Sequence, residues 1–98
     1  MKIIIPMRLD KISDEFENCE YFLIFEIKDG EINAVKTVFN DNCGEKIKQK
    51  IDAVICKKIN EKNYKKFSKK GVIYKAEGDD VDKNISLLLE NKLKELYK

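Results

Sequence analysis

The chain has 98 residues, of which 43% are hydrophobic and 39% charged, and its formal net charge is +2. This length fits one domain with a single hydrophobic core, and the lack of any run of 18 apolar residues excludes a membrane-spanning helix. There is no histidine, which excludes the histidine-based catalytic arrangements. Three cysteines, an odd number without a recognisable signal peptide, predict reduced thiols in a cytoplasm rather than a disulfide framework.

The first half of the chain predicts three strands. Residues 3–7 form a continuous apolar run, which is typical of a strand buried on both faces. Residues 8–20 are polar and lack periodicity, so we expect a loop. Two strand-like segments, residues 21–28 and residues 32–40, are joined by Asp29-Gly30, and this dipeptide predicts a type I′ hairpin.

The middle of the chain predicts two helices around a strand. A short helix over residues 45–50 precedes an apolar strand over residues 53–56. The next helix begins at Asn60 or Asn63, both of which can cap a helix N-terminus. It ends before Gly71, which we expect to be its C-terminal cap.

The last quarter predicts a short strand over residues 72–74 and a closing helix. Asp79 or Asp80 can cap this helix. An apolar stripe follows at spacings of three and four, which is typical of an amphipathic helix. The stripe consists of Val81, Ile85, Leu88, Leu89, Leu93 and Leu96.

The order of these elements, β-β-β-α-β-α-β-α, predicts an α/β fold. Right-handed crossovers make the strands at 53–56 and 72–74 parallel to the first strand, and the hairpin makes the second strand antiparallel. We therefore predict a five-stranded mixed sheet. Its order is 3-2-1-4-5, counting strands along the chain, and three helices cover its two faces.

All three cysteines fall at one edge of the predicted sheet. Cys19 precedes the second strand, Cys43 follows the third, and Cys56 ends the fourth. Their spacing matches no zinc signature, and a buried cysteine packs as a small hydrophobe. We favour core packing for Cys19 and Cys56. Cys43, in a loop before a helix, is the stronger functional candidate, because a helix N-terminus lowers the pKa of a thiol.

The middle of the chain is strongly basic. Residues 46–75 hold eleven lysines against two acidic residues. This balance indicates either a solvated helix face or a site for an anion, which could be a nucleic acid or an anionic cofactor. Lys57 and Lys58 lie between a strand and a helix N-terminus, where backbone amides attract anions.

Several segments, in this order and spacing, resemble one known family. They are Met1–Pro6, Ser13–Glu17, Tyr21-Phe22, Asp29-Gly30, Ile51–Cys56, Lys70–Tyr74 and Val81–Leu93. The chain is similar over residues 1–98 to the dinitrogenase iron–molybdenum cofactor biosynthesis family, and would be a single domain like the NifX-like proteins and nitrogenase accessory factors. The resemblance implies a ribonuclease H-like, three-layer α/β/α fold. It also implies a cytoplasmic, non-enzymatic protein that binds or carries an iron–sulfur or iron–molybdenum cluster or its precursor.

The implied binding site departs from the family's pattern. Glu15 and Cys43 stand where the family has histidines, and Lys57 and Asn60 follow the fourth strand where the family tends to have glycines. We therefore expect a cofactor-binding set made of Cys43, Glu15, Lys57 and Asn60. Because thiolates suit iron–sulfur clusters, the candidate metal ligands are Cys43, Cys19 and Cys56.

The expected partners are a metal cluster or proteins of cluster biosynthesis, with no membrane partner. We expect a monomer or a weak homodimer, since the strand at 32–40 is a sheet edge and a pairing surface. The alternative is a nucleic-acid or protein interaction module that uses the lysine-rich face of residues 46–75. The lysines are not interleaved with exposed aromatic residues, which disfavours recognition of single-stranded nucleic acid.

Overall fold

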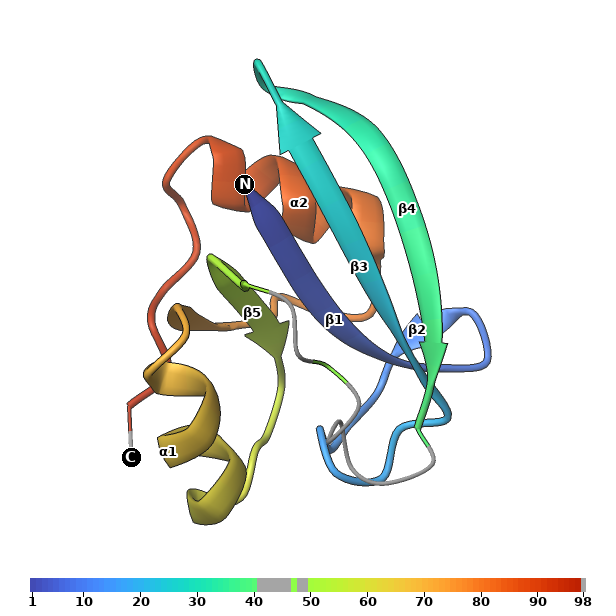
Figure 1. Cartoon of the computed structure of the whole chain (residues 1–98), viewed down its shortest axis with the longest axis vertical. Helices are drawn as coiled ribbons and strands as arrows, with labels where there is room; N and C mark the ends of the chain where they lie inside the picture. Colours follow the sequence, from blue (N-terminus) through green and yellow to red (C-terminus); the bar gives the residue numbers. More distant parts are fainter. Residues whose placement is uncertain (41–46, 48–49, 98) are drawn as a thin grey trace.

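The structure, a computed structural model, describes residues 1–40, 47 and 50–97 (Figure 1). A single mixed sheet has the strand order β4-β3-β1-β5-β6, and a short strand β2 pairs with β1 beside this row. The strands are β1 Lys2–Arg8, β2 Lys11–Ile12, β3 Tyr21–Lys28, β4 Glu31–Phe39, β5 Ala53–Cys56 and β6 Val72–Lys75. The helices of the described residues are α1 Glu61–Ser68 and α2 Val81–Leu89.

The arrangement of the five longer strands agrees with the prediction. β3 runs antiparallel to β1, whereas β5 is parallel to β1 and β6 is parallel to β5. The hairpin between β3 and β4 turns at Asp29-Gly30, whose φ angles of 54° and 77° are the positive values that a type I′ turn requires.

The sheet has a sixth strand where a loop was predicted. Within residues 8–20, Lys11 pairs with Arg8 and Ile12 with Met7, so β2 folds back on β1. The turn passes through Leu9, which has a φ of 56°. Leucine seldom adopts a positive φ, so the sequence offered no turn signal here.

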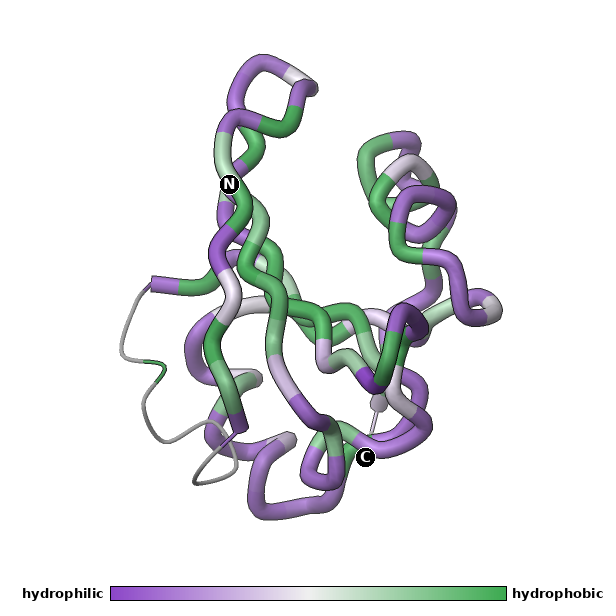
Figure 2. The backbone as a smooth tube through the Cα atoms, turned by 90° about the vertical axis from the view of Figure 1, so that its right-hand side faces the viewer, coloured by the Kyte–Doolittle hydropathy of each residue, from purple (hydrophilic) through white to green (hydrophobic). Residues whose placement is uncertain are grey.

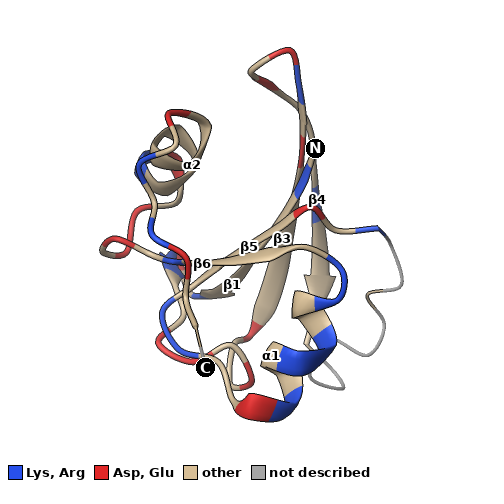
Figure 3. Ribbon diagram, turned by 90° about the vertical axis from the view of Figure 1, so that its left-hand side faces the viewer, with Lys and Arg blue, Asp and Glu red and all other residues tan. Residues whose placement is uncertain are grey.

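A helix covers each face of the sheet (Figures 2 and 3). Ile3 and Ile5 of β1 pack in one core with Ile85 of α2, while Ile4 packs in a second core with Phe67 of α1. Alternate side chains of a strand point to opposite faces, which explains why the apolar run of β1 serves both cores. In Figure 2 the hydrophobic residues concentrate along the central strands.

Of the first predicted helix, over residues 45–50, the structure describes residues 47 and 50, and neither is helical. The described residues thus hold two of the three predicted helices, and the rest of the first lies outside them. Ile47 and Ile51 are both buried, at 2% and 0% exposure. The second predicted helix is α1, and Asn60 caps it by accepting a hydrogen bond from the Asn63 backbone N–H at 2.8 Å.

Gly71 does not cap α1 as predicted. The C-terminal cap is Lys69, and Gly71 instead lies against the backbone of the segment before β5. A Cβ atom at Gly71 would come within 2.5 Å of the Asp52 carbonyl oxygen. The position therefore needs glycine for close approach between two segments of backbone.

The closing helix is shorter than predicted. Asp80 caps α2, but the helix ends at Leu89, and Asn91 adopts a φ of 59°. The N–H groups of Asn91 and Lys92 donate to the carbonyl oxygens of Leu88 and Leu87 at 3.0 and 2.8 Å. This pairing is a Schellman motif, which turns the chain out of the helix.

The residues after this turn run as an extended segment along β6. The Lys75 N–H donates to the Lys94 carbonyl and the Leu96 N–H to the Ile73 carbonyl, both at 2.8 Å. Leu93 packs in the core beneath α2, and Leu96 packs against the core beneath α1. At eight and nine residues, the two helices of the described part of the chain are too short to span a bilayer.

Candidate functional site

The candidate site lies where β1, β5 and β6 end and their following loops meet. A cavity of about 570 Å³ opens there. It is lined by Glu15, Glu17, Lys57, Lys58, Ile59, Asn60, Lys75, Glu95, Leu96 and Tyr97. Ligand sites of α/β sheets commonly occur outside the carboxyl ends of parallel strands, so this position agrees with the edge predicted from the topology.

Phe16 fixes the loop after β2 to the rest of the site. Its side chain is fully buried, and its ring centroid lies 5.0 Å from those of both Phe22 and Phe67. Its backbone N–H donates to the carbonyl of Lys58 at 2.8 Å. One aromatic side chain therefore holds the Glu15 and Glu17 loop against the segment that leads into α1.

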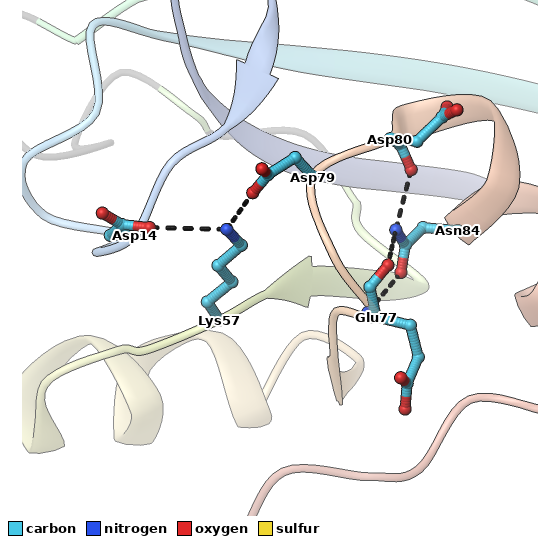
Figure 4. A network of polar contacts seen from close by, with 6 residues as sticks. All are labelled: Asp14, Lys57, Glu77, Asp79, Asp80 and Asn84. Carbon is cyan, nitrogen blue, oxygen red and sulfur yellow. Dashed lines mark hydrogen bonds and ion pairs between the residues drawn. The ribbon is translucent and has the colours of Figure 1, made fainter.

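Lys57 joins three loops of this edge (Figure 4). Its ammonium forms ion pairs with Asp79, in the loop after β6, and with Asp14, in the loop after β2, where the Nζ to Oδ1 distance is 3.4 Å. The hydrogen bond to Asp79 is the main reason that the pKa of Lys57 is raised. The same bond lowers the pKa of Asp79. Lys57 was predicted to bind a cofactor, but its charge is already engaged by two carboxylates of the chain.

Asn84 braces the loop that presents Asp79 (Figure 4). The Asn84 side chain is fully buried, and its Oδ1 accepts from the Glu77 N–H at 2.7 Å. Its Nδ2 donates to the carbonyl oxygens of Glu77 and Asp80 at 2.9 and 2.7 Å. Sequence reasoning missed Asn84, although its place one turn after Val81 on the inward stripe was a usable signal.

The N-terminus of α1 is occupied by a carboxylate of the chain itself. Oε1 of Glu17 accepts from the Asn60 backbone N–H at 2.5 Å and from the Asn63 side chain at 3.3 Å. The positive end of a helix favours an anion, and Glu17 supplies it. Asn60, predicted to bind a cofactor, thus lines the cavity while its side chain serves as the cap of α1.

Cys19 and Cys56 are buried, at 6% and 0% exposure, and both belong to the apolar core beneath α1. Their expected core packing is confirmed. Cys43 lies outside the described residues. The described part of the chain holds no group of three Cys, Asp or Glu side chains that could hold a metal ion. A cluster site built from the three thiols therefore stays a prediction.

The structure brings together Glu15, Lys57 and Asn60, three of the four residues predicted to bind a cofactor. Sequence reasoning missed the cavity wall formed by Glu95 and Tyr97, because this segment was predicted to be helical. The Glu95 carboxylate, hydrogen-bonded to Tyr97, raises the pKa of that phenol.

Comparisons with known proteins decide the family. The family model described as dinitrogenase iron-molybdenum cofactor matches residues 1–91. The chain belongs to this family. The residues that match the dinitrogenase iron-molybdenum cofactor family model include every described strand and both described helices, from β1 through α2.

Relatives and solved structures agree with this membership. Protein MJ0327 of Methanocaldococcus jannaschii is 56% identical over 98 residues, which are 98% of this chain and 94% of the relative. Its crystal structure superposes with a TM-score of 0.95 at 55% identity, covering 100% of this chain and 96% of that one. Protein MJ0580 of the same organism is 32% identical over 105 residues, covering 95% of this chain and 89% of the relative. The NMR structure of TM1290 from Thermotoga shares the fold, with a TM-score of 0.78 at 23% identity. The superposition covers 99% of this chain and 94% of that one.

Proposed function

We propose that this protein is a small, non-enzymatic carrier of an iron–sulfur or iron–molybdenum cluster, or of a precursor, during cofactor biosynthesis. Membership of the dinitrogenase iron-molybdenum cofactor family supports the proposal. The observation that carries it is the cavity at the sheet edge, whose lining includes Lys58 and Lys75 beside three glutamates. Ammonium groups around a cavity suit a negatively charged cargo. The proposed setting is a cytoplasm, with proteins of cluster biosynthesis as partners, on a fold of ribonuclease H-like topology.

The cavity lining holds three lysines and three glutamates, and the described carboxylates do not gather into a group that could hold a metal ion. Iron–sulfur clusters are held by thiolates, but Cys19 and Cys56 pack in the apolar core. Among the described residues, the cavity offers ammonium, amide, phenol and carboxylate groups. The proposed thiolate ligand is therefore Cys43, which lies outside the described residues, with the lysines neutralising the charge of the cargo.

Within the cavity the lysines differ in what they can contribute. Lys57 is held by Asp14 and Asp79 and fixes the loops. The proposal therefore assigns charge neutralisation to Lys58 and Lys75, which come from the segment after β5 and from the end of β6. Replacing either should weaken cargo binding without loosening the loops.

Anaerobic reconstitution with ferrous iron and sulfide tests this function. After gel filtration, the protein should retain iron and sulfide and show a visible charge-transfer absorption. Cys43→Ala and Lys75→Glu should each reduce the retained iron, whereas Lys62→Glu, on the exposed side of α1, should not. Failure of the unmodified protein to retain iron and sulfide would remove the proposal.

One observation favours the alternative function, a module that binds an anionic polymer. The outer side of α1 carries exposed lysines, among them Lys62, Lys65 and Lys69 (Figure 3). Lys65 is paired with Glu61 at 3.3 Å, which reduces the free charge. If this face bound nucleic acid, binding to a labelled oligonucleotide would fall by at least about tenfold between roughly 50 and 200 mM salt. Lys62→Glu would then weaken it, in contrast to its neutral effect on cluster uptake.

A further inference from the structure

The two edge strands of the sheet, β6 and β4, differ in whether another segment of the chain covers them. The outer side of β6 is covered by residues 94–96, through the backbone bonds of Lys75 and Leu96 and a bridge between Tyr74 and Glu95. At the other edge, β4 pairs with β3 alone among the described residues. Eight of its nine residues are exposed, Val38 being the exception. Within the described part of the chain, β4 therefore presents a row of backbone donors and acceptors that no neighbouring strand pairs.

One face of this open edge is apolar. Ile32, Val35 and Phe39 are 47%, 52% and 71% exposed. Residues opposite each other on antiparallel strands point to the same face. The three residues pair, in that order, with Ile27, Phe25 and Tyr21 of β3. Ile27 and Phe25 belong to the core beneath α2, and Tyr21 packs against it. The three exposed side chains thus continue this face along β4, whose turn with β3 projects from the molecule (Figures 1 and 2).

We propose that β4 pairs antiparallel with β4 of a second copy of this chain, giving a two-fold dimer with one continuous sheet. The strand is self-complementary in one register. In it, Glu31 lies opposite the partner's Lys36, and Ile32 lies opposite the partner's Val35. Because the axis is two-fold, each pair occurs twice, so two ion pairs flank two apolar pairs.

A bulge in β4 makes this register geometrically consistent. Ile32 pairs with Ile27 and Ala34 with Glu26, which leaves Asn33 as an extra residue. The extra residue places Ile32 and Val35, three positions apart, on the α2 face. It likewise places Glu31 and Lys36, five positions apart, on the α1 face. A two-fold axis between Asn33 and Ala34 therefore sets each residue opposite a partner residue of its own face.

The same features select a second copy over other strands. A charge in the middle of an edge strand normally prevents pairing, since it would lie against an apolar or like-charged neighbour. Lys36 therefore disfavours pairing with any strand that has no acidic residue opposite it. In a second copy of this chain, Glu31 lies opposite Lys36 and provides the matching negative charge. The surface buried by one strand pair is small, so we expect weak association, with a Kd of roughly 10 μM to 1 mM.

Charge reversal tests both the surface and the register. Sedimentation velocity over a concentration series should show the unmodified chain dimerising. Glu31→Lys and Lys36→Glu should each raise the Kd by about tenfold or more, because each sets two like-charged pairs opposite each other. An equimolar mixture of the two variants should dimerise again, since unlike charges then meet at both positions. Lys69→Glu, at the C-terminal cap of α1, should leave the Kd unchanged.

The outcomes separate this dimer from other uses of the edge. Circular dichroism and urea unfolding confirm that each variant is folded before it is compared. A chain that stays monomeric at about 1 mM would overturn the proposal and leave β4 to a different partner. A dimer that both single variants retain, or that their mixture fails to restore, would overturn it as well, because its contacts would then lie elsewhere.

Discussion

Asn84→Ala gives the most direct test of how the candidate site is held together. The Asn84 side chain is fully buried and makes three hydrogen bonds, at 2.7, 2.9 and 2.7 Å, to Glu77 and Asp80. Alanine leaves the Glu77 N–H and two carbonyl oxygens without these partners. One buried unsatisfied group costs about 1–3 kcal/mol. Since water can reach part of this loop, we expect the free energy of unfolding to fall by about 2–4 kcal/mol.

Urea unfolding monitored by circular dichroism measures this change by linear extrapolation. Ser86→Ala is the matched control, because Ser86 is an exposed residue of the same helix and should shift the free energy of unfolding by less than about 0.5 kcal/mol. A loss of less than about 1 kcal/mol for Asn84→Ala would contradict the reasoning, because the loop would then not depend on these hydrogen bonds.

Three further predictions concern other contacts of the fold and site. Gly71→Ala places a Cβ 2.5 Å from the Asp52 carbonyl oxygen and should lower the free energy of unfolding by about 1–3 kcal/mol in urea titrations; an unchanged midpoint would refute the close approach. The pKa of Asp79 is lowered from 3.8 by its bond to Lys57, so the stabilisation by this pair is present above pH 3.8 and is lost as the pH falls through the folded pKa. Asp79→Asn should therefore lower the thermal midpoint near neutral pH but not in strong acid, and an equal deficit at both would contradict the ion pair. Asn91→Ala puts alanine at a φ of 59° and should cost about 1 kcal/mol, whereas Asn91→Gly should cost nothing measurable.

The sequence predicts the sheet well because its signals are local. The continuous apolar run of β1 and the Asp29-Gly30 turn depend only on neighbouring residues, and the structure confirms both. The C-terminal segment shows the opposite case. Leu93 and Leu96 keep a helical spacing, yet each packs against a different core in an extended chain. The Schellman turn at Asn91 decides between the two outcomes, and asparagine is only an occasional residue at that position.

The sequence predicted the location of the candidate site better than it predicted the side-chain contacts within it. Topology alone set the loops after β1, β5 and β6 at one edge, and Glu15 and Lys57 line the cavity there. The pairing of Lys57 with Asp79 joins residues 22 positions apart, which no local pattern reports. Likewise, the sequence indicated that a helix N-terminus would attract an anion, but not that Glu17 would provide it.

The segment that crosses from Leu93 to Leu96 has a consequence for how the molecule opens. A sheet separates the two cores, so each helix could in principle detach without the other. Leu93, at one end of this segment, packs in the core beneath α2, and Leu96, at the other end, packs against the core beneath α1. The backbone of the segment also forms hydrogen bonds with β6. Release of either helix must therefore disturb a tether shared with the other. We expect the amides of Lys75 and Leu96 to exchange with solvent only in global unfolding, and the two layers to lose structure as one cooperative unit.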